Sequence, residues 1–216
     1  REFLKQLEDA GELRRIDIPV ATELEITELA DREMKKPGGG QALLFENPTL
    51  NGNPTDIPLA INTMGSQKRM AMTLGRDSVD EAATELGKLM QAKPPTSFRE
   101  TISLLGTALE LRHAKPKKAK DGPCKEVIIK GDDLKNTGTG MPTLLNLPIQ
   151  QCWPQDAGRF ITLPCVVTQD PDSGARNLGI YRMQVFDSQT TGMHWQLQKV
   201  AARHGRRYYE RGERMP

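Results

Sequence analysis

The chain has 216 residues, of which 37% are hydrophobic, 5% aromatic and 27% charged. This length allows one large or two small globular domains, and the composition excludes a collagen-like or wholly disordered chain. Thirty basic and 28 acidic side chains leave a formal charge of +2, which argues against a dedicated nucleic-acid binder. No run approaches about 18 consecutive apolar residues, and the start of the chain lacks the layout of a signal peptide. We therefore expect a soluble cytoplasmic protein.

Cys124, Cys152 and Cys165 cannot all pair within one chain, and they show no CxxC spacing. Free thiols in a reducing compartment are the expectation. The chain starts without Met, and no closing signal follows the charged stretch before 214–216. We expect a fragment of a longer protein.

Two stretches of the first half carry a helix-start signal followed by apolar residues at helical spacing. Thr22 with Glu25 and Ser78 with Glu81 each have the spacing of a capping box. The first predicts a helix that ends before a proline and three glycines, and the second predicts a helix at 79–90.

Shorter elements complete the first half. The apolar spacing predicts an amphipathic helix in residues 1–10, an extended segment at 13–20 and a helical stripe at 98–109. Apolar runs at 42–45 and 57–61, bounded by Asn, Pro and Gly, favour buried strands.

The composition changes near the middle of the chain. Residues 1–112 indicate a small α/β domain, and the Lys- and Pro-rich stretch 113–123 is typical of a linker. Residues 124–216 indicate a mainly β domain, in which 170–174 (DPDSG) predicts a turn. The fold class is therefore α+β. Four segments rich in β-branched or aromatic residues predict strands: 126–130, 160–167, 177–186 and 193–197.

Polar side chains gather between residues 170 and 204. A strand that begins at Asn177 carries Tyr181 and Arg182, and a following strand carries His194 and Trp195. Two neighbouring strands would bring these side chains to one pocket. Strand alternation places Arg182 on an otherwise apolar face, where a guanidinium needs a partner. A structural carboxylate and an anionic ligand are both open.

Five motifs in chain order resemble the UbiD family of decarboxylases. They are LEITELADR at 24–32, FENP at 45–48, CWPQDAG at 152–158, NLGIYR at 177–182 and MHW at 193–195. The resemblance implies a split β-barrel flavin-binding domain after the α/β domain. It also implies non-oxidative decarboxylation of aromatic or α,β-unsaturated acids with prenylated FMN. One such acid is 3-polyprenyl-4-hydroxybenzoate in ubiquinone biosynthesis.

The resemblance assigns roles to the NLGIYR motif and the residues after it. Asn177 would bind a metal, usually Mn2+ with K+ as a further cation, although alone it is typical of a turn or strand-cap residue. Arg182 would orient the substrate carboxylate and carry the proton. Flavin contacts are implied at Ile180, Tyr181, Arg182, His194, Trp195, Gln196, Lys199 and Val200. Lys199 and Val200 would lie beside the phosphate.

The chain also departs from the family pattern. Gln198 and Lys199 stand where relatives often carry a metal-binding His, so the second ligand is unassigned. The acidic metal ligand and two catalytic glutamates of the family would lie beyond this chain, which alone would be inactive. The resemblance further implies a flavin prenyltransferase as cofactor supplier and a homo-oligomer. It also implies peripheral membrane contact if the substrate is polyprenylated.

Two other functions stay open. A different flavin enzyme on a split barrel is one. A nucleic-acid or partner-binding module is the other, suggested by the basic stretch 115–120 and the basic, tyrosine-containing segment 203–211. His113 and His204 have no paired acid in the sequence, and we expect both to be solvated. Cys152 is expected to be a packed thiol and 132–133 a turn.

Overall fold

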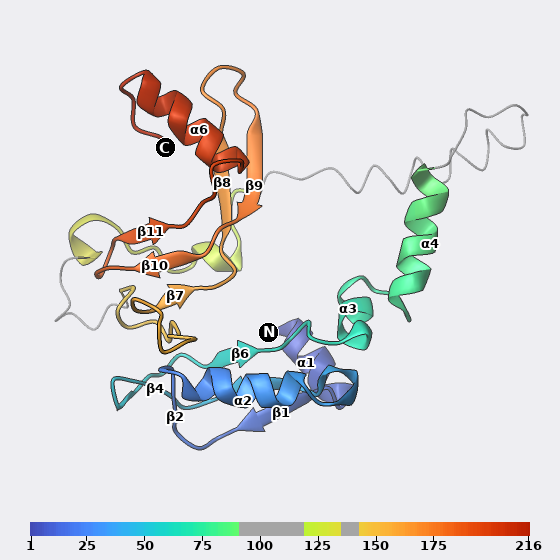
Figure 1. Cartoon of the computed structure of the whole chain (residues 1–216). Coiled ribbons are helices and arrows are strands. Elements are labelled where there is room, and N and C mark those ends of the chain that lie inside the picture. The colour runs from blue at the N-terminus through green and yellow to red at the C-terminus, as the bar shows by residue number, and fades with distance from the viewer. Residues whose placement is uncertain (91–118, 135–142) are drawn as a thin grey trace, which may run out of the picture. The chain divides into compact units, whose positions relative to one another are not determined.

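The computed structural model describes residues 1–90, 119–134 and 143–216. They form two compact units, Arg1–Ser66 with Ile129–Pro216 and Gln67–Ile128 (Figure 1). Helices and small sheets are mixed, which confirms the predicted α+β class. No sheet among these described ranges closes into a barrel. The helical stripe predicted at 98–109 and the start of the predicted linker lie outside the described residues. The predicted domain boundary at 113–123 stays a prediction.

The N-terminal part of the first unit contains two small mixed sheets. In one, β1 runs parallel to β3 and β6 runs antiparallel to β3, and in the other β2 runs parallel to β4 and β5 antiparallel to it. The elements are α1 (Glu2–Asp9), β1 (Leu13–Ile16), β2 (Val20–Ala21), α2 (Glu25–Met34), the 3-10 turn η1 (Pro37–Gly39), β3 (Ala42–Phe45), β4 (Pro48–Leu50), β5 (Asn53–Pro54) and β6 (Leu59–Ile61). The buried strand predicted at 42–45 is confirmed as β3. Of the segment 57–61 only Leu59–Ile61 form a strand, β6, in which Leu59 alone is buried, and β6 pairs with β3 in one sheet.

An apolar core joins α2 to this sheet. Ile26 of α2 and Phe45 of β3 are fully buried, and all four residues of β3 are buried. The core cluster consists of Val20, Ile26, Leu43, Phe45 and Leu59. Burying an aliphatic or aromatic side chain contributes about 1.5 to 3 kcal/mol. This region therefore has a core of its own.

The start of α2 differs from the predicted capping box. The N-cap position belongs to Leu24, with no side-chain cap bond. Thr22 is fully buried, and its hydroxyl donates to the Thr49 carbonyl at 2.9 Å. Glu25 accepts a hydrogen bond from the Ala21 N–H at 2.8 Å. A buried hydroxyl needs a hydrogen-bond partner. Thr22 finds its partner in β4 and so joins the end of β2 to that strand.

The second compact unit contains α3 (Gln67–Thr73), α4 (Val79–Met90) and the 3-10 turn η3 (Pro123–Lys125) among its described residues. The predicted helix at 79–90 is confirmed with its cap. The Ser78 hydroxyl accepts the Glu81 N–H, and the Glu81 carboxylate accepts the Asp77 N–H, both at 3.1 Å. The strand predicted at 126–130 is wrong, since no strand forms there. Its two apolar side chains nearest η3, Val127 and Ile128, are exposed and have no sheet to pack on.

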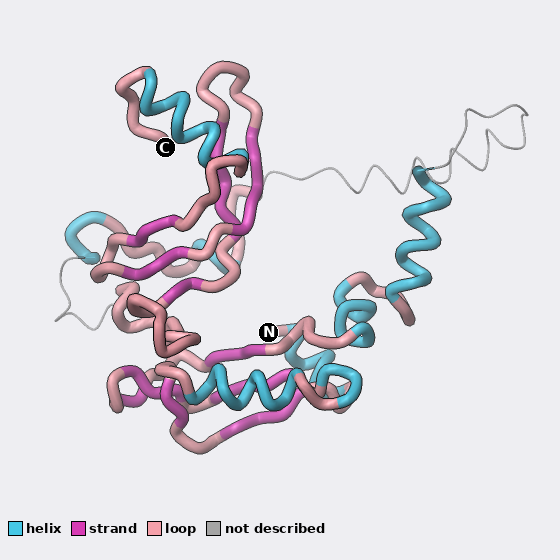
Figure 2. Tube along the Cα trace, viewed as in Figure 1, coloured by secondary structure: helices cyan, strands magenta, loops and turns pink. Residues whose placement is uncertain are grey.

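The C-terminal part of the first unit is made of short strands and one helix. They are the 3-10 turn η4 (Gly131–Leu134), β7 (Phe160–Ile161), β8 (Cys165–Gln169), β9 (Arg176–Ile180), β10 (Met183–Val185), β11 (Thr191–Met193) and α6 (Val200–Glu210). The strand β10 pairs antiparallel with both β7 and β11, and β8 pairs antiparallel with β9. Figure 2 shows these strands as short segments between loops. Five short strands and one α-helix thus form the described part of this region.

The strand boundaries are where the sequence prediction fails. The segment 160–167 is interrupted before β8, and 177–186 is interrupted at Tyr181 and Arg182 between β9 and β10. Of the last predicted strand, 193–197, only Met193 lies in a strand, β11, so the placement of His194 and Trp195 in a strand is wrong. A proline at position 164 accounts for the first break, since it lacks the N–H that a ladder needs.

Two further predictions from the sequence concern the cysteines and membrane-spanning segments. The three cysteines are free, as expected. None of the helices in the described ranges has both the length and the apolar character needed to cross a membrane.

Candidate active site

The hairpin of β8 and β9 supplies the frame of the site. Thr168 stands opposite Asn177 in its register, and the turn between the strands has the predicted form, with Gly174 at φ 70°. The Asp170 N–H donates to the Ala175 carbonyl at 2.9 Å and closes the turn. Asn177 therefore lies in a fixed place on the hairpin and next to a buried threonine.

The two faces of β9 differ from the prediction. Asn177 is half-buried, whereas Leu178 and Ile180 are 67% and 60% exposed. Arg182 does not share their face as a strand residue, because β9 ends at Ile180. The polar side of the strand is the one that turns inward.

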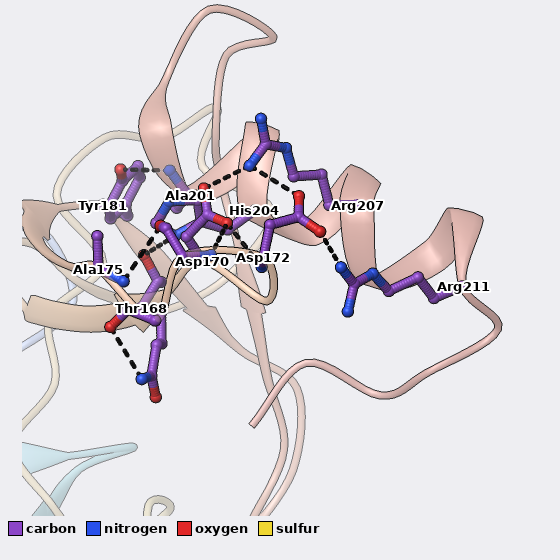
Figure 3. A network of polar contacts seen from close by, with 12 residues as sticks. Thr168, Asp170, Asp172, Ala175, Tyr181, Ala201, His204, Arg207 and Arg211 are labelled. Carbon is purple, nitrogen blue, oxygen red and sulfur yellow. Dashed lines mark hydrogen bonds and ion pairs between the residues drawn. The ribbon is translucent and has the colours of Figure 1, made fainter.

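Tyr181 connects the end of β9 to α6. Its side chain is 5% exposed, and its hydroxyl accepts the Ala201 N–H at 3.1 Å (Figure 3). The tyrosine ring lies directly over Gly179, where an added Cβ would come within 2.5 Å of ring carbon Cε2. Glycine is therefore required at 179 for this ring position. The contact fixes the first turn of α6 beside the end of the strand.

Trp195 makes a second aromatic contact with α6. A Cβ at Gly205 would lie 2.7 Å from indole atom Cη2, so the ring rests on the helix backbone at that position. The chain then reaches the N-cap of α6 at Lys199, whose N–H donates to the Gln196 carbonyl at 3.0 Å. Gly179 and Gly205 thus leave room for the Tyr181 and Trp195 rings, which pack at α6 and fix its position.

A polar network ties α6 to the turn of the hairpin, as Figure 3 shows. The Thr168 hydroxyl lies 3.0 Å from His204 Nδ1, and His204 Nε2 lies 3.7 Å from the Asp170 carboxylate. Arg207 donates to the same carboxylate at 2.6 Å, and Arg211 pairs with Asp172. The prediction that His204 is solvated is wrong, because its side chain is only 2% exposed. His113 lies outside the described residues.

Asp170 is the centre of this network. Burial of its carboxyl by itself raises the pKa, but the Ser173 N–H and the Arg207 guanidinium outweigh burial, and the net pKa is lowered. The carboxylate also accepts the Asp172 N–H at 2.9 Å. Asp170 is therefore held ionised as the anchor of both the turn and α6.

Arg182 has a carboxylate partner, one of the two possibilities left open by the sequence. Its two terminal nitrogens donate to the two oxygens of Asp156 at 2.9 and 2.7 Å. The guanidinium carbon lies 3.9 Å from the Phe160 ring centroid and 5.2 Å from that of Trp153. The ion pair lowers the pKa of Asp156 and raises that of Arg182. Both groups are thus charged at neutral pH.

The structure gathers several of the predicted residues around the segment 180–182. The His194 N–H donates to the Arg182 carbonyl at 3.0 Å, although the His194 side chain is exposed. Tyr181 links the segment to the first turn of α6, where Val200 begins the helix. Five of the predicted flavin contacts have exposed side chains: Ile180, His194, Trp195, Gln196 and Lys199.

A metal and a flavin phosphate require hard oxygen ligands and cationic or N–H donors, respectively. The Asn177 side chain is half-buried and has no hydrogen-bond partner among the described residues, so its amide oxygen is available as a hard ligand. Lys199 stands at the N-terminal end of α6, where helix N–H groups and an ammonium favour an anion. In the described part of the chain no three His, Cys, Asp or Glu side chains come together as a metal cluster. These residues fit one side of a metal and phosphate site, and the remaining ligands are not among them.

The sequence prediction missed Asp156, Thr168 and Asp170 as site residues. The CWPQDAG motif contained Asp156, but its partner lies 26 residues further on. A signal for the burial of His204 was present, since Ala201, His204 and Tyr208 follow helical spacing, and all three are buried.

Two family models match the chain. Residues 4–90 match the 3-octaprenyl-4-hydroxybenzoate carboxy-lyase N-terminal domain, and residues 115–216 match the Rift-related domain of the same carboxy-lyase. Together they cover most of the sequence in the expected order. The chain belongs to the UbiD family of carboxy-lyases.

A relative is similar over nearly the whole of this chain. An uncharacterized protein of Archaeoglobus fulgidus is 42% identical over 212 residues, which cover 98% of this chain and 40% of the relative. This chain spans about 40% of the length of the curated relatives that it matches.

Solved structures of UbiD-class enzymes have the same fold. HmfF of Pelotomaculum thermopropionicum in complex with FMN is 26% identical with a TM-score of 0.68, over 100% of this chain and 40% of that one. An evolved dimeric form of HmfF in complex with prFMN is 24% identical with a TM-score of 0.67, over 100% and 42%. Vanillic acid decarboxylase of Sedimentibacter hydroxybenzoicus, in an open form, is 26% identical with a TM-score of 0.70, over 98% and 38%.

Proposed function

We propose that this chain is the cofactor-binding part of a non-oxidative decarboxylase that acts on aromatic or α,β-unsaturated carboxylic acids with prenylated FMN. The observation that carries the proposal is the hydrogen bond from the Ala201 N–H to the Tyr181 hydroxyl, which fixes the first turn of α6 beside the end of β9. Asn177 lies in that strand, and Arg182, which pairs with Asp156, follows directly after Tyr181. HmfF, solved with FMN, supports a flavin as the cofactor.

The cofactor contacts follow from the positions of the residues. Lys199 and the N–H groups in the first turn of α6 other than that of Ala201, which donates to Tyr181, would hold the flavin phosphate, and the Asn177 oxygen would bind a Mn2+ beside it, with K+ as a further cation. Tyr181 and Trp195 would fix the edge of the flavin site through their packing on Gly179 and Gly205. When bound, prenylated FMN supplies an electron sink for the departing carboxylate.

Arg182 would provide the substrate contact. A guanidinium presents five N–H donors, and the ion pair with Asp156 uses two of them. The other donors would orient a substrate carboxylate. The acidic residues that complete the metal site and deliver the proton would come from the remaining part of a longer protein. The relatives are long enough to contain such a part, because this chain covers only 40% of the first one.

The finer assignments belong to the same proposal. A 3-polyprenyl-4-hydroxybenzoate substrate would place the protein in ubiquinone biosynthesis and require peripheral membrane contact. A flavin prenyltransferase would supply the cofactor, and the protein would be cytoplasmic and act as a homo-oligomer. This chain by itself would bind flavin weakly and turn over no substrate.

The test is co-expression with a flavin prenyltransferase, followed by native mass spectrometry of the 216-residue chain and of the longer protein. We expect retained prenylated FMN, weakly on the chain, and CO2 release by the longer protein only. Asn177→Ala should reduce Mn2+ and cofactor retention, whereas Gln189→Ala, which removes an exposed amide in a turn, should not. Absence of any retained flavin on the longer protein contradicts the proposal.

Two other functions predict different results. A split-barrel enzyme that uses ordinary flavin would retain unmodified FMN, with a different absorbance spectrum. A nucleic-acid module would need free basic side chains, yet Arg207 and Arg211 are paired with Asp170 and Asp172. We expect no strongly salt-dependent affinity for single strands.

A further inference from the structure

Hydrogen bonds to groups other than Arg182 hold Asp156 in place. One of its carboxylate oxygens accepts the Trp153 N–H at 3.2 Å, and its backbone carbonyl accepts the Gln151 side-chain amide at 3.3 Å. Its side chain is 10% exposed, against 30% for Arg182. The carboxylate is therefore a firm, mostly buried support for the more exposed guanidinium.

Two aromatic rings restrict the guanidinium further. Phe160, in β7, lies 3.9 Å from the guanidinium carbon, and its strand pairs with β10 next to Arg182. The centroid of the Trp153 ring lies 5.2 Å from the same carbon. A carboxylate that binds both terminal nitrogens and a stacked ring together fix the position and plane of the group.

The pair is also electrically neutral as a whole. The Arg182 contact lowers the pKa of Asp156, so the carboxylate stays ionised and cancels the positive charge. A substrate carboxylate that reaches this group meets oriented N–H donors rather than a full positive charge.

Neutrality matters for the proposed reaction. In decarboxylation the bond between the carboxylate carbon and its neighbour breaks, the electron pair stays on that neighbour, and CO2 leaves without charge. A proton then takes the vacated position. A strong cation at the carboxylate would stabilise the substrate more than the transition state, because the negative charge leaves the carboxylate as the bond breaks.

We propose that Asp156 is a positioning residue that fixes Arg182 and neutralises its charge, so that a substrate carboxylate is oriented without being held too tightly. This inference rests on the proposed function for the substrate contact. The arrangement of Asp156, Arg182 and Phe160 does not depend on the cofactor.

The first test uses NMR of the guanidinium N–H groups in the 216-residue chain, assigned by their loss in Arg182→Lys. In the wild-type chain we expect separate, slowly exchanging signals for Arg182. In Asp156→Asn they should merge and exchange at least tenfold faster, since a charge-assisted pair is lost. The control Asp31→Asn removes an exposed pair with Lys35 and should leave them unchanged. Averaged Arg182 signals in the wild-type chain would overturn the proposal without any variant.

The second test measures decarboxylation in the longer, cofactor-loaded protein. For Asp156→Asn we expect KM for the acid to fall while kcat falls about tenfold. A variant that only unfolds would lose kcat in proportion to the folded fraction with KM unchanged, and that result would overturn the proposal. If the wild-type protein releases no CO2, the proposed function fails, while the NMR result still decides whether Asp156 fixes Arg182.

Discussion

The two parts of the first compact unit are stabilised in different ways. Around β3 the chain buries a cluster of aliphatic and aromatic side chains, with Phe45 and Ile26 fully buried. Around β8, β9 and α6 the buried side chains include His204, Thr168 and Asp170, while Leu178 of the hairpin is largely exposed. Hydrophobic burial stabilises the first part. In the second part, a network of hydrogen bonds and ion pairs holds α6 against the hairpin of β8 and β9.

The difference has physical consequences. Apolar burial is insensitive to pH and tolerates small shifts, whereas a polar network depends on the ionisation of its members and on hydrogen-bond geometry. Hydrogen bonds also join the two parts, for example from the Leu24 N–H to the Gln151 carbonyl and from the Gln151 N–H to the Thr22 carbonyl, at 3.0 and 3.2 Å. A functional site in the second part therefore has a well-defined geometry, but its stability is more sensitive to pH and to changes in hydrogen-bond geometry.

The largest effect is expected from Phe45→Ala in the apolar core. Removing a fully buried phenyl ring leaves a cavity and should lower the free energy of unfolding by about 3 to 5 kcal/mol. Denaturant unfolding with hydrogen exchange would measure it, and we expect amides of β3 to lose protection before those of β8 and β9. Equal loss in both parts would show that they unfold as one unit and break the comparison.

The control for this substitution is Ile18→Ala. Its side chain is 63% exposed, so the free energy of unfolding should change by no more than about 0.5 kcal/mol.

A smaller effect is expected from Gly179→Ala. The new methyl group would collide with the Tyr181 ring, displace its hydroxyl from Ala201 and loosen the start of α6. Overpacking of this kind costs about 1 to 3 kcal/mol, and hydrogen exchange of α6 amides should rise. Gly122→Ala is the matched control, because an added Cβ there meets only the Cys124 sulfur at 4.0 Å. Unchanged α6 protection in Gly179→Ala would contradict the role given to Tyr181.

The sequence predicts local elements better than the contacts that make the site. The helix at 79–90 follows from its cap and apolar spacing, which are local signals. The break after Ile180 arises where the chain brings Tyr181 to α6. Such long-range contacts have no local pattern.

Long-range contacts also explain why the roles of single residues such as Thr22 and Asp156 were not predicted correctly. Thr22 has the spacing of a cap, yet its hydroxyl bonds to a neighbouring strand that the sequence does not place beside it. The family resemblance supplied the candidate roles of Asn177 and Arg182, and it gave no role to Asp156. A bidentate ion pair across 26 residues becomes visible only when the loop and the strand are folded together.

The smallest effect concerns pH and distinguishes the polar part from the apolar part. Asp170 has a pKa lowered from 3.8, so its contribution to stability is present above about pH 3.8 and is lost as the pH falls through the lower folded-state value. Asp170→Asn should be less stable than wild type at pH 6, with the gap narrowing below pH 3.8. Circular dichroism melts of both chains from pH 6 to about 2.5 would measure the gap. The control Asp121→Asn changes an exposed carboxyl and should follow the wild-type curve. A gap that stays constant through this range would mean that the Asp170 network does not depend on its charge, and the hairpin would then resemble the apolar core after all.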